Sequence, residues 1–256
     1  MPIGVARAGF GGKRTTFLLT ISASVNDKNL RTVANAAGYI NQTDITITIN
    51  SNITIGSTTT ATAALVPGTW PSGVTVTLVN NGYIRGKGGA GGPGANFDGT
   101  NHVGTAGSSG GTALNASGIS GFTFAVDNTS GTIAGGGGGG GGGYSWASLG
   151  CCCSYYGAAG AGGGGGQGDG GGAGGAAGTG NTGWGVPTNG TAGTNASVGF
   201  GNITPNSSYR SGNGGAYGAT GGTDSGSAAG GAGGNSVSGT ANITWIAFGI
   251  RTGTVA

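Results

Sequence analysis

The sequence predicts a mostly non-α fold with two parts. One is a small β-rich module with one helix, and the other is a polyglycine-II helix bundle, a Gly-rich sandwich that carries loops. Three observations support this prediction. Glycine accounts for 68 of the 256 residues, and 56 of those glycines lie within residues 86–234. The other residues of that region recur in steps of three, whereas both ends of the chain carry ordinary β-type patterns. We therefore expect a β-rich module of residues 1–85 plus 240–256 and a Gly-rich domain of residues 86–239.

The N-terminal part contains one helical pattern between strand-like segments. Phe17–Val25 is apolar enough for an opening strand. Asn26 and Asp27 belong to the residue types that cap helices, and Gly38 is a typical stop. The apolar residues between these signals follow helical spacing: Leu30, Val33, Ala34 and Ala37. The spacing predicts an amphipathic helix of about three turns.

The remaining ordinary segments predict strands. Ile45–Ile49 and Val74–Leu78 alternate apolar residues with Thr, which is typical of half-buried strands. With Ile53 and Ile55 the first of them forms a longer strand or a hairpin. Ala241–Ile250 is apolar on both parities, so we expect a strand that is covered on both faces and joins the N-terminal sheet.

The Gly-rich region has a period of three, which fits neither an α-helix nor a strand. It matches the polyproline-II conformation, which has three residues per turn and a rise of ~3.1 Å. Five segments carry the pattern: 86–94, 135–143, 157–180, 212–222 and 229–235. Backbones approach closely only where no Cβ separates them, so nine consecutive glycines at 135–143 predict the interior helix of the bundle. The alternative is a flexible Gly linker or a silk-like aggregate.

Segments of different composition separate the Gly runs. They carry large aromatic side chains, which offer much contact area at a low entropic cost. The segments Thr112–Ala134 and Gln167–Gly170 are expected to turn at the opposite end, near the β-rich module. The alternative role of the aromatic rings is to shield loop backbone. The candidate binding residues are Tyr144, Trp146, Tyr155, Tyr156, Trp184, Tyr209 and, as a further candidate, Phe97.

Several functions are excluded by composition. The net charge of +3 is too dilute for a nucleic-acid footprint, and no run of 18 apolar residues could span a membrane. One His, six Asp and no Glu show no catalytic spacing, so we expect neither an enzyme, nor a cofactor, nor a metal site. His102 is interpreted as a surface-loop residue. Cys151–Cys153 could form a vicinal disulfide, an intermolecular bridge or three free thiols.

The Gly-Gly-x runs with aromatic loops between them resemble the distal tail-fibre adhesins of T-even-like bacteriophages. The resemblance covers residues 86–234 and rests on composition and period; Gly82–Gly89 and Ile243–Trp245 also look like tail-fibre ends of other tailed phages. It implies a virion protein at the distal end of a tail fibre or tail tip, which acts at the host cell surface. Its loops would contact a bacterial outer-membrane protein or lipopolysaccharide.

The same resemblance implies that the β-rich module attaches to a phage fibre or tail-tip protein, as a monomer or a homotrimer. Two alternative functions remain. An ice-binding protein would need a flat Thr/Ala face and no aromatic loops. A structural Gly-rich protein would need regular repeats without a folded N-terminal module.

Overall fold

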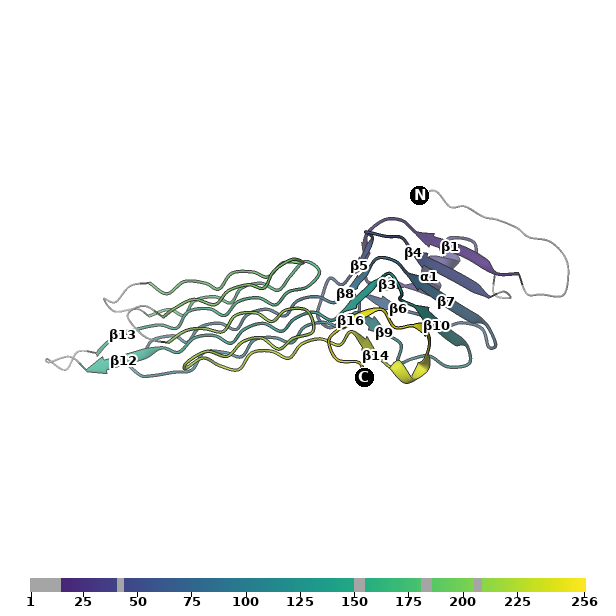
Figure 1. Ribbon diagram of the computed structural model, residues 1–256. Helices are drawn as coiled ribbons and strands as arrows, with labels where there is room; N and C mark the ends of the chain where they lie inside the picture. The colour runs from purple at the N-terminus through teal and green to yellow at the C-terminus, as the bar shows by residue number, and fades with distance from the viewer. Residues whose placement is uncertain (1–14, 41–43, 150–154, 181–185, 205–208) are drawn as a thin grey trace.

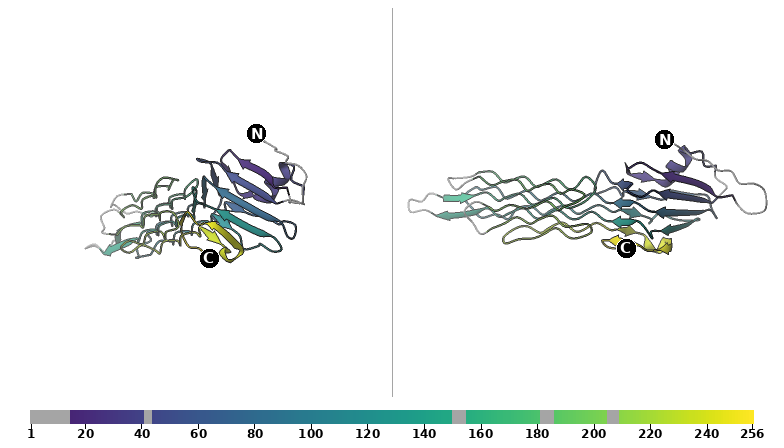
Figure 2. Two further views of the ribbon diagram at one scale, coloured as in Figure 1. Left: turned by 45° about the vertical axis from the view of Figure 1, so that its right-hand side comes forward. Right: turned by 45° about the horizontal axis from the view of Figure 1, so that its top comes forward.

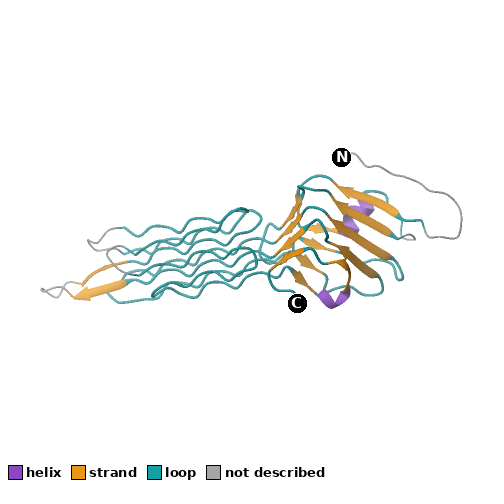
Figure 3. Cartoon of the chain, viewed as in Figure 1, coloured by secondary structure: helices purple, strands orange, loops and turns teal. Residues whose placement is uncertain are grey.

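The computed structural model describes residues 15–40, 44–149, 155–180, 186–204 and 209–256. Strands gather at one end of an elongated molecule, and long extended segments run side by side away from them (Figure 1). The two further views in Figure 2 show the same separation, so it does not result from the viewing direction. Figure 3 shows that the long region consists of loop backbone, with a short hairpin at its far end.

Three parallel sheets form the strand-rich end. The first sheet contains, in spatial order, β1 (Phe17–Ile21), β4 (Ile45–Ile49), β7 (Thr75–Asn80), β10 (Thr123–Asp127) and β15 (Ile243–Ala247). The second contains β2 (Val25–Asn26), β5 (Thr54–Gly56), β8 (Tyr83–Arg85), β11 (Thr132–Ala134) and β16 (Ile250–Thr252). The third contains β3 (Lys28–Asn29), β6 (Leu65–Val66), β9 (Leu114–Asn115) and β14 (Val237–Ser238). The chain visits the three sheets in the same order on each turn, which makes this end a three-sided parallel β-helix.

The interior of the β-helix is filled by the apolar positions of the alternating strands. Ile47 of β4 pairs in register with Leu78 of β7, and both side chains are fully buried. Phe124 of β10 lies beside Val76 of β7 one layer further along. Burying each such side chain contributes roughly 1.5–3 kcal/mol to folding. The Thr residues between them point outward, so the predicted half-buried strands are confirmed.

Two buried asparagines join turns of the β-helix at the corner between the first and second sheets. Asn80 Nδ2 donates to Asn128 Oδ1 at 2.7 Å, and both residues are fully buried. Asn128 Nδ2 in turn donates to the carbonyl oxygens of Phe248 at 2.9 Å and Ile250 at 3.1 Å. These bonds satisfy polar groups that would otherwise cost ~1–3 kcal/mol each when buried. They therefore connect successive turns where the strands end.

The helix is shorter than predicted and begins later. Helix α1 spans Leu30–Ala36, and Asn29 is its N-cap, accepting a hydrogen bond from the Thr32 amide at 3.2 Å. Asn26 ends strand β2 instead of capping the helix, because β2 and β3 complete the first turn of the β-helix. Gly38 follows the helix with φ of +89°, as a helix stop requires. A single-turn 3-10 helix, η1, spans Thr240–Asn242.

The C-terminal strand joins the predicted sheet but is covered on one face only. Strand β15 pairs with β10 and forms the edge of the sheet that begins with β1. Ile243 is buried, whereas Ile246 is 59% exposed. The prediction that β15 is covered on both faces is wrong. Strand β15 lies in the last turn of the β-helix, and no described element packs on its outer face. The alternative of a hairpin at residues 45–55 is also wrong, since β4 and β5 belong to different sheets.

The predicted fold class is correct for the β-rich module with one α-helix and wrong for the polyglycine-II helix bundle. The regular elements that define the fold are the parallel sheets, and the described Gly-rich residues form no helix. The physical reason is that Gly-Gly-x spacing determines which faces a neighbour can approach, whereas Gly leaves the backbone conformation open. The sheets recruit β9, β10, β11 and β14 from within residues 86–239.

The Gly-rich segments are held by backbone hydrogen bonds to one another. Along 135–143, donors to the same neighbouring segment recur every third residue. The amides of Gly136, Gly139 and Gly142 donate to the carbonyl oxygens of Gly111, Ser108 and Thr105, respectively. The amides of Gly137, Gly140 and Gly143 donate to those of Gln167, Gly164 and Ala161, and the amides of Gly138 and Gly141 donate to those of Ala219 and Gly222. The innermost position predicted for 135–143 is therefore observed, with every residue of that stretch buried.

A turn of the Gly-rich region rests on the β-helix where the two parts meet. The carboxylate of Asp169 packs against Gly56 of β5, where a Cβ would overlap it. Burial raises the pKa of Asp169, while Lys87 and Arg85 partly oppose that shift. Lys87 Nζ also donates to the Gly170 carbonyl oxygen at 3.3 Å. The turn thus lies near the β-rich module, as predicted, and its contacts fix where the Gly-rich segments begin.

Candidate functional site

The far end of the Gly-rich region, opposite the β-helix, carries an antiparallel hairpin (Figures 1 and 2). Its strands are β12 (Trp146–Leu149) and β13 (Tyr155–Ala158), with Trp146 opposite Ala158 and Leu149 opposite Tyr155. The hairpin is the direct continuation of the central segment 135–143. Rigid extended backbone therefore leads into it from both sides.

Two of the predicted aromatic residues come together at the base of this hairpin. The rings of Tyr144 and Tyr209 have centroids 4.9 Å apart and planes inclined by 52°. Thr204 Oγ1 donates to the Tyr144 carbonyl oxygen at 3.1 Å, and Gly226 lies under the ring of Tyr209. Three loops that are far apart in the sequence thus share one contact. Such offset aromatic pairs contribute about 0.5–1.5 kcal/mol beyond their buried area.

Phe97 has a different position from the other candidates. Its side chain is only 8% exposed, and its ring lies where a Cβ on Gly157 would be. Gly157 belongs to β13, so the ring of Phe97 packs against the hairpin at this strand. A side chain this buried supports the hairpin and offers little surface to a ligand.

The loop after Phe97 braces the same hairpin through polar contacts. The Ala147 amide donates to Asn101 Oδ1 at 2.7 Å, and the Ser145 amide donates to the His102 carbonyl oxygen at 2.9 Å. His102 Nε2 lies 3.0 Å from both carboxylate oxygens of Asp98. Sequence reasoning missed Asn101 and Ser145, because nothing in their local pattern indicates a partner some 45 residues away.

Asp98 has an unusually low pKa for an exposed carboxylate. The Thr100 hydroxyl, 2.6 Å away, is the main cause, followed by His102, and together they lower the pKa of Asp98 to about 2. Because the pKa of Asp98 is lower in the folded loop than its ordinary value of 3.8, the ionised carboxylate stabilises the folded loop at any pH above 3.8. That contribution is lost as the pH falls through about 2. At neutral pH the carboxylate of Asp98 is therefore ionised and this contribution to the loop is fully present.

Substituting Thr100→Val is expected to raise the pKa of Asp98 back toward 3.8, because the valine cannot donate to the carboxylate. Side-chain carboxyl titration by NMR measures this directly. Thr129→Val is a matched control, since the Thr129 hydroxyl lowers the pKa of Asp127 in the same way at the β-helix. A wild-type Asp98 that titrates near 3.8 would contradict the geometry of this loop.

The other predicted site residues are placed as follows. Trp146 is half-buried on β12, and Tyr155 and Tyr156 contribute backbone to β13. Trp184 and Cys151–Cys153 lie outside the described residues. Four exposed apolar side chains of the Gly-rich region are not among the predicted contacts: Val103, Val186, Phe200 and Ile203. The three aliphatic ones are single residues in polar loops and give no sequence signal, whereas Phe200 is an aromatic residue between Gly runs, which is the signal that selected the other candidates.

The described residues show neither a metal-binding cluster nor a membrane-spanning helix. No group of three or more His, Cys, Asp or Glu side chains is arranged to hold a metal ion. Within the same described ranges, the helices are too short and too polar to cross a membrane.

Comparison with known proteins shows that the class of protein is a phage tail-fibre adhesin. The model of the family described as phage tail fibre adhesin Gp38 matches residues 16–256, and the chain belongs to this family. Membership places it in the virion, at the distal end of a tail fibre, where it acts at the host cell surface. No curated protein sequence matches the chain.

One solved structure is similar in fold. It is described as the crystal structure of the gp37-gp38 adhesin tip complex of the bacteriophage S16 long tail fiber. The match has 24% sequence identity and a TM-score of 0.59, and it covers 93% of this chain and 82% of that chain. The likeness extends over both the β-helix and the Gly-rich region.

Proposed function

We propose that the far-end loops of this adhesin recognise a receptor on the bacterial surface. The observation that carries the proposal is the meeting of three separate loops at the Tyr144–Tyr209 pair, directly at the base of the β12–β13 hairpin. Aromatic side chains that emerge from fixed backbone are the residue types that usually dominate binding energy. The candidate contacts are Tyr144, Trp146, Tyr155, Tyr156, Trp184 and Tyr209.

The scaffold supports recognition by reducing the entropic cost of binding. Backbone hydrogen bonds of 2.7–3.2 Å connect 135–143 to the segments 89–95, 105–111, 161–167, 212–222 and 228–234. Because both ends of each loop are held, fewer degrees of freedom are lost when the loop binds. Loops on such a scaffold also tolerate replacement, which suits a protein that must follow a changing receptor. Phe97 is buried, so we assign it to support of the hairpin.

The receptor is a protein of the outer membrane or a lipopolysaccharide, since a protein side chain and a sugar ring both stack on aromatic rings. The role is recognition without catalysis. Family membership removes the support for an ice-binding or a structural Gly-rich protein.

The opposite part of the chain is the attachment module. Residues 1–85 plus 240–256 supply most of the β-helix, and the Gly-rich domain of residues 86–239 extends from it, with β9–β11 and β14 returning to its sheets. The structurally similar protein was crystallised as a gp37-gp38 complex. By analogy, the β-helix of this chain binds a phage fibre or tail-tip protein.

A binding experiment with the purified full chain tests receptor recognition. Outer-membrane fractions of candidate hosts are incubated with the chain, with one aliquot protease-treated and a second aliquot replaced by purified lipopolysaccharide. Loss of binding after proteolysis identifies a protein receptor, and binding to lipopolysaccharide alone identifies a glycan. Absence of binding to the fractions of a host that the phage infects would contradict the proposal.

A further inference from the structure

A buried threonine bonds to the backbone of both members of the Tyr144–Tyr209 pair. Thr204 is fully buried, and its hydroxyl donates to the Tyr144 carbonyl oxygen at 3.1 Å and accepts from the Ala161 amide at 3.4 Å. The Thr204 amide donates to the Tyr209 carbonyl oxygen at 3.0 Å. One residue therefore joins the backbone that enters the β12–β13 hairpin, the backbone that leaves it and the segment that carries Tyr209.

A glycine from a further segment packs against the same two tyrosines. Gly226 lies in a turn with φ of +72°, and a Cβ added there would lie 2.6 Å from Cδ1 of Tyr209 and 3.2 Å from Cβ of Tyr144. The Arg210 amide donates to the Ser225 carbonyl oxygen at 3.4 Å, which ties this turn to the segment after Tyr209. Glycine adopts this φ readily, and it lacks the Cβ that would overlap the ring. The close contact therefore depends on glycine at this position.

These contacts make the position of each segment depend on the others. A shift of Tyr144 would break the hydrogen bond of the Thr204 hydroxyl, and a shift of Tyr209 would change the surface on which Gly226 packs. Residues in direct contact of this kind are energetically coupled. Thr204 is buried and Gly226 has no side chain, so both act on a receptor through the tyrosines they hold.

We propose that the segments around the Tyr144–Tyr209 pair form one recognition unit, in which Thr204 and Gly226 are positioning residues that determine receptor specificity. The proposal rests on the proposed recognition of a receptor by the far-end loops, and it names what holds those loops in register. Affinity depends on how well contact groups are preorganised before binding. Because the geometry of each segment is fixed by its neighbours, no single loop carries the specificity alone.

Binding of the purified full chain to outer-membrane fractions of a susceptible host tests the role of Thr204. Thr204→Val removes the hydroxyl but keeps the shape of the side chain, so the Tyr144 carbonyl oxygen loses its partner. We expect the apparent Kd to rise about tenfold or more, since the loss of one partner of a buried hydrogen bond has an effect of that size. Thr204→Ser keeps the hydroxyl and should bind within about threefold of wild type.

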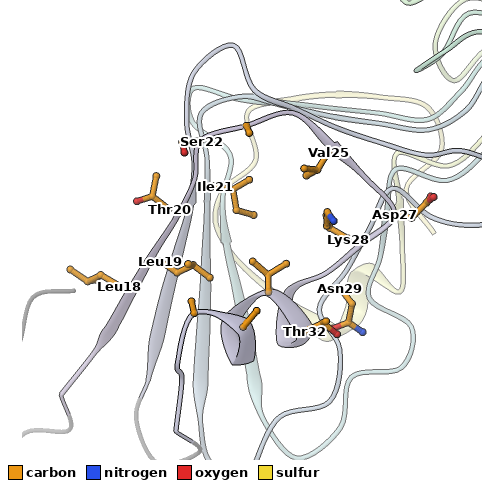
Figure 4. A pocket seen from close by; sticks show the side chains of 14 residues that line it. Leu18, Leu19, Thr20, Ile21, Ser22, Val25, Asp27, Lys28, Asn29 and Thr32 are labelled. Carbon is orange, nitrogen blue, oxygen red and sulfur yellow. Dashed lines mark hydrogen bonds between the residues drawn. The ribbon is translucent and has the colours of Figure 1, made fainter. Parts of the chain in front are cut away.

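Two control substitutions separate positioning from stability. Ser236→Ala removes a hydroxyl that is also fully buried and donates to the Thr254 carbonyl oxygen at 3.1 Å, at the β-helix end. Thr20→Val makes the same chemical change as Thr204→Val beside the apolar groove between β1 and α1, also at the β-helix end (Figure 4). Both controls should bind with wild-type affinity, although Ser236→Ala should lower Tm as Thr204→Val does. A purely structural role of Thr204 would lower Tm without raising the Kd.

A double-mutant cycle tests the coupling through Gly226. In Gly226→Ala the added methyl overlaps the Tyr209 ring, so we expect binding to weaken about tenfold, whereas in the Tyr209→Ala background the same change should add less than about twofold. Gly170→Ala is the matched control, because Gly170 has a similar φ of +67° in a turn at the β-helix end. A Cβ there would meet only the flexible side chain of Lys87. This control should bind like wild type, which removes positive-φ strain as the cause.

The outcomes separate this proposal from the proposed function. Wild-type affinity of both Thr204→Val and Gly226→Ala would overturn the positioning role and leave receptor recognition intact. Additive effects of Gly226→Ala and Tyr209→Ala would show that the segments bind independently, which also overturns the proposal. If Thr204→Val does not fold, the cycle through Gly226 decides alone. If the wild-type chain binds none of the host fractions, receptor recognition itself fails.

Discussion

Phage that carry a short Gly/Ser turn in place of residues 144–156 are expected to lose adsorption to their host or to change host. The replacement removes the β12–β13 hairpin together with one ring of the Tyr144–Tyr209 pair. It leaves the hydrogen bonds of 135–143 in place, so the fold is expected to persist. Removing an aromatic anchor typically costs ~2 kcal/mol or more of binding energy, and this variant removes several at once. Adsorption rate constants on the native host measure the effect.

The control for this variant is a replacement at the opposite end of the Gly-rich region. The turn at Thr194–Ser197 is closed by a 2.8 Å backbone hydrogen bond and carries no large aromatic side chain. A Gly/Ser turn of equal length there should leave adsorption within about twofold of wild type, since it lies away from the hairpin. If the hairpin replacement adsorbs normally, the parts of residues 181–211 outside the Thr194–Ser197 turn become the expected receptor-binding loops.

The second large effect concerns the packing of the central Gly segment. Gly139→Ala is expected to lower the free energy of unfolding by about 3 kcal/mol or more, at the upper end of overpacking effects. An added Cβ would lie 1.9 Å from the Ala90 carbonyl oxygen and 2.3 Å from its carbon. Both atoms belong to backbone that is itself hydrogen-bonded on its other side, so neither can move independently. For a chain of this size, such a loss lowers Tm by roughly 6–12 °C.

Ala90→Ser is the matched substitution for comparison. Ala90 contributes the carbonyl that Gly139 approaches, but its own side chain is partly exposed. We expect a change in Tm of less than about 2 °C, since surface changes usually stay within ±0.5 kcal/mol. Differential scanning calorimetry of the two variants gives the comparison. A Gly139→Ala protein that melts with wild type would show that the Gly segments are not in contact in solution.

The sequence by itself determined several features of this protein. Alternation in Ile45–Ile49 specified which side chains are buried, because a strand has a side-chain period of two. The concentration of glycine in 86–234 specified that backbones approach one another there, because no other residue permits it. The aromatic residues between the Gly runs predict a binding surface there, and this stays a prediction. Residues 135–143 were correctly expected to lie innermost.

Only the tertiary structure decided how these pieces are arranged. Parallel pairing joins strands across long connections, so nothing local showed that β10, β11 and β14 complete the turns of a β-helix. The local sequence also did not show which residue caps α1. Asn29 is the N-cap, because Asn26 is paired with β5 as the last residue of β2. The Gly-Gly-x period could not specify a helix bundle, because glycine admits many backbone conformations and only contacts between distant segments select one. The burial of Phe97 has a related origin: it comes from packing against Gly157, sixty residues away, and packing at that range leaves no mark on the local sequence.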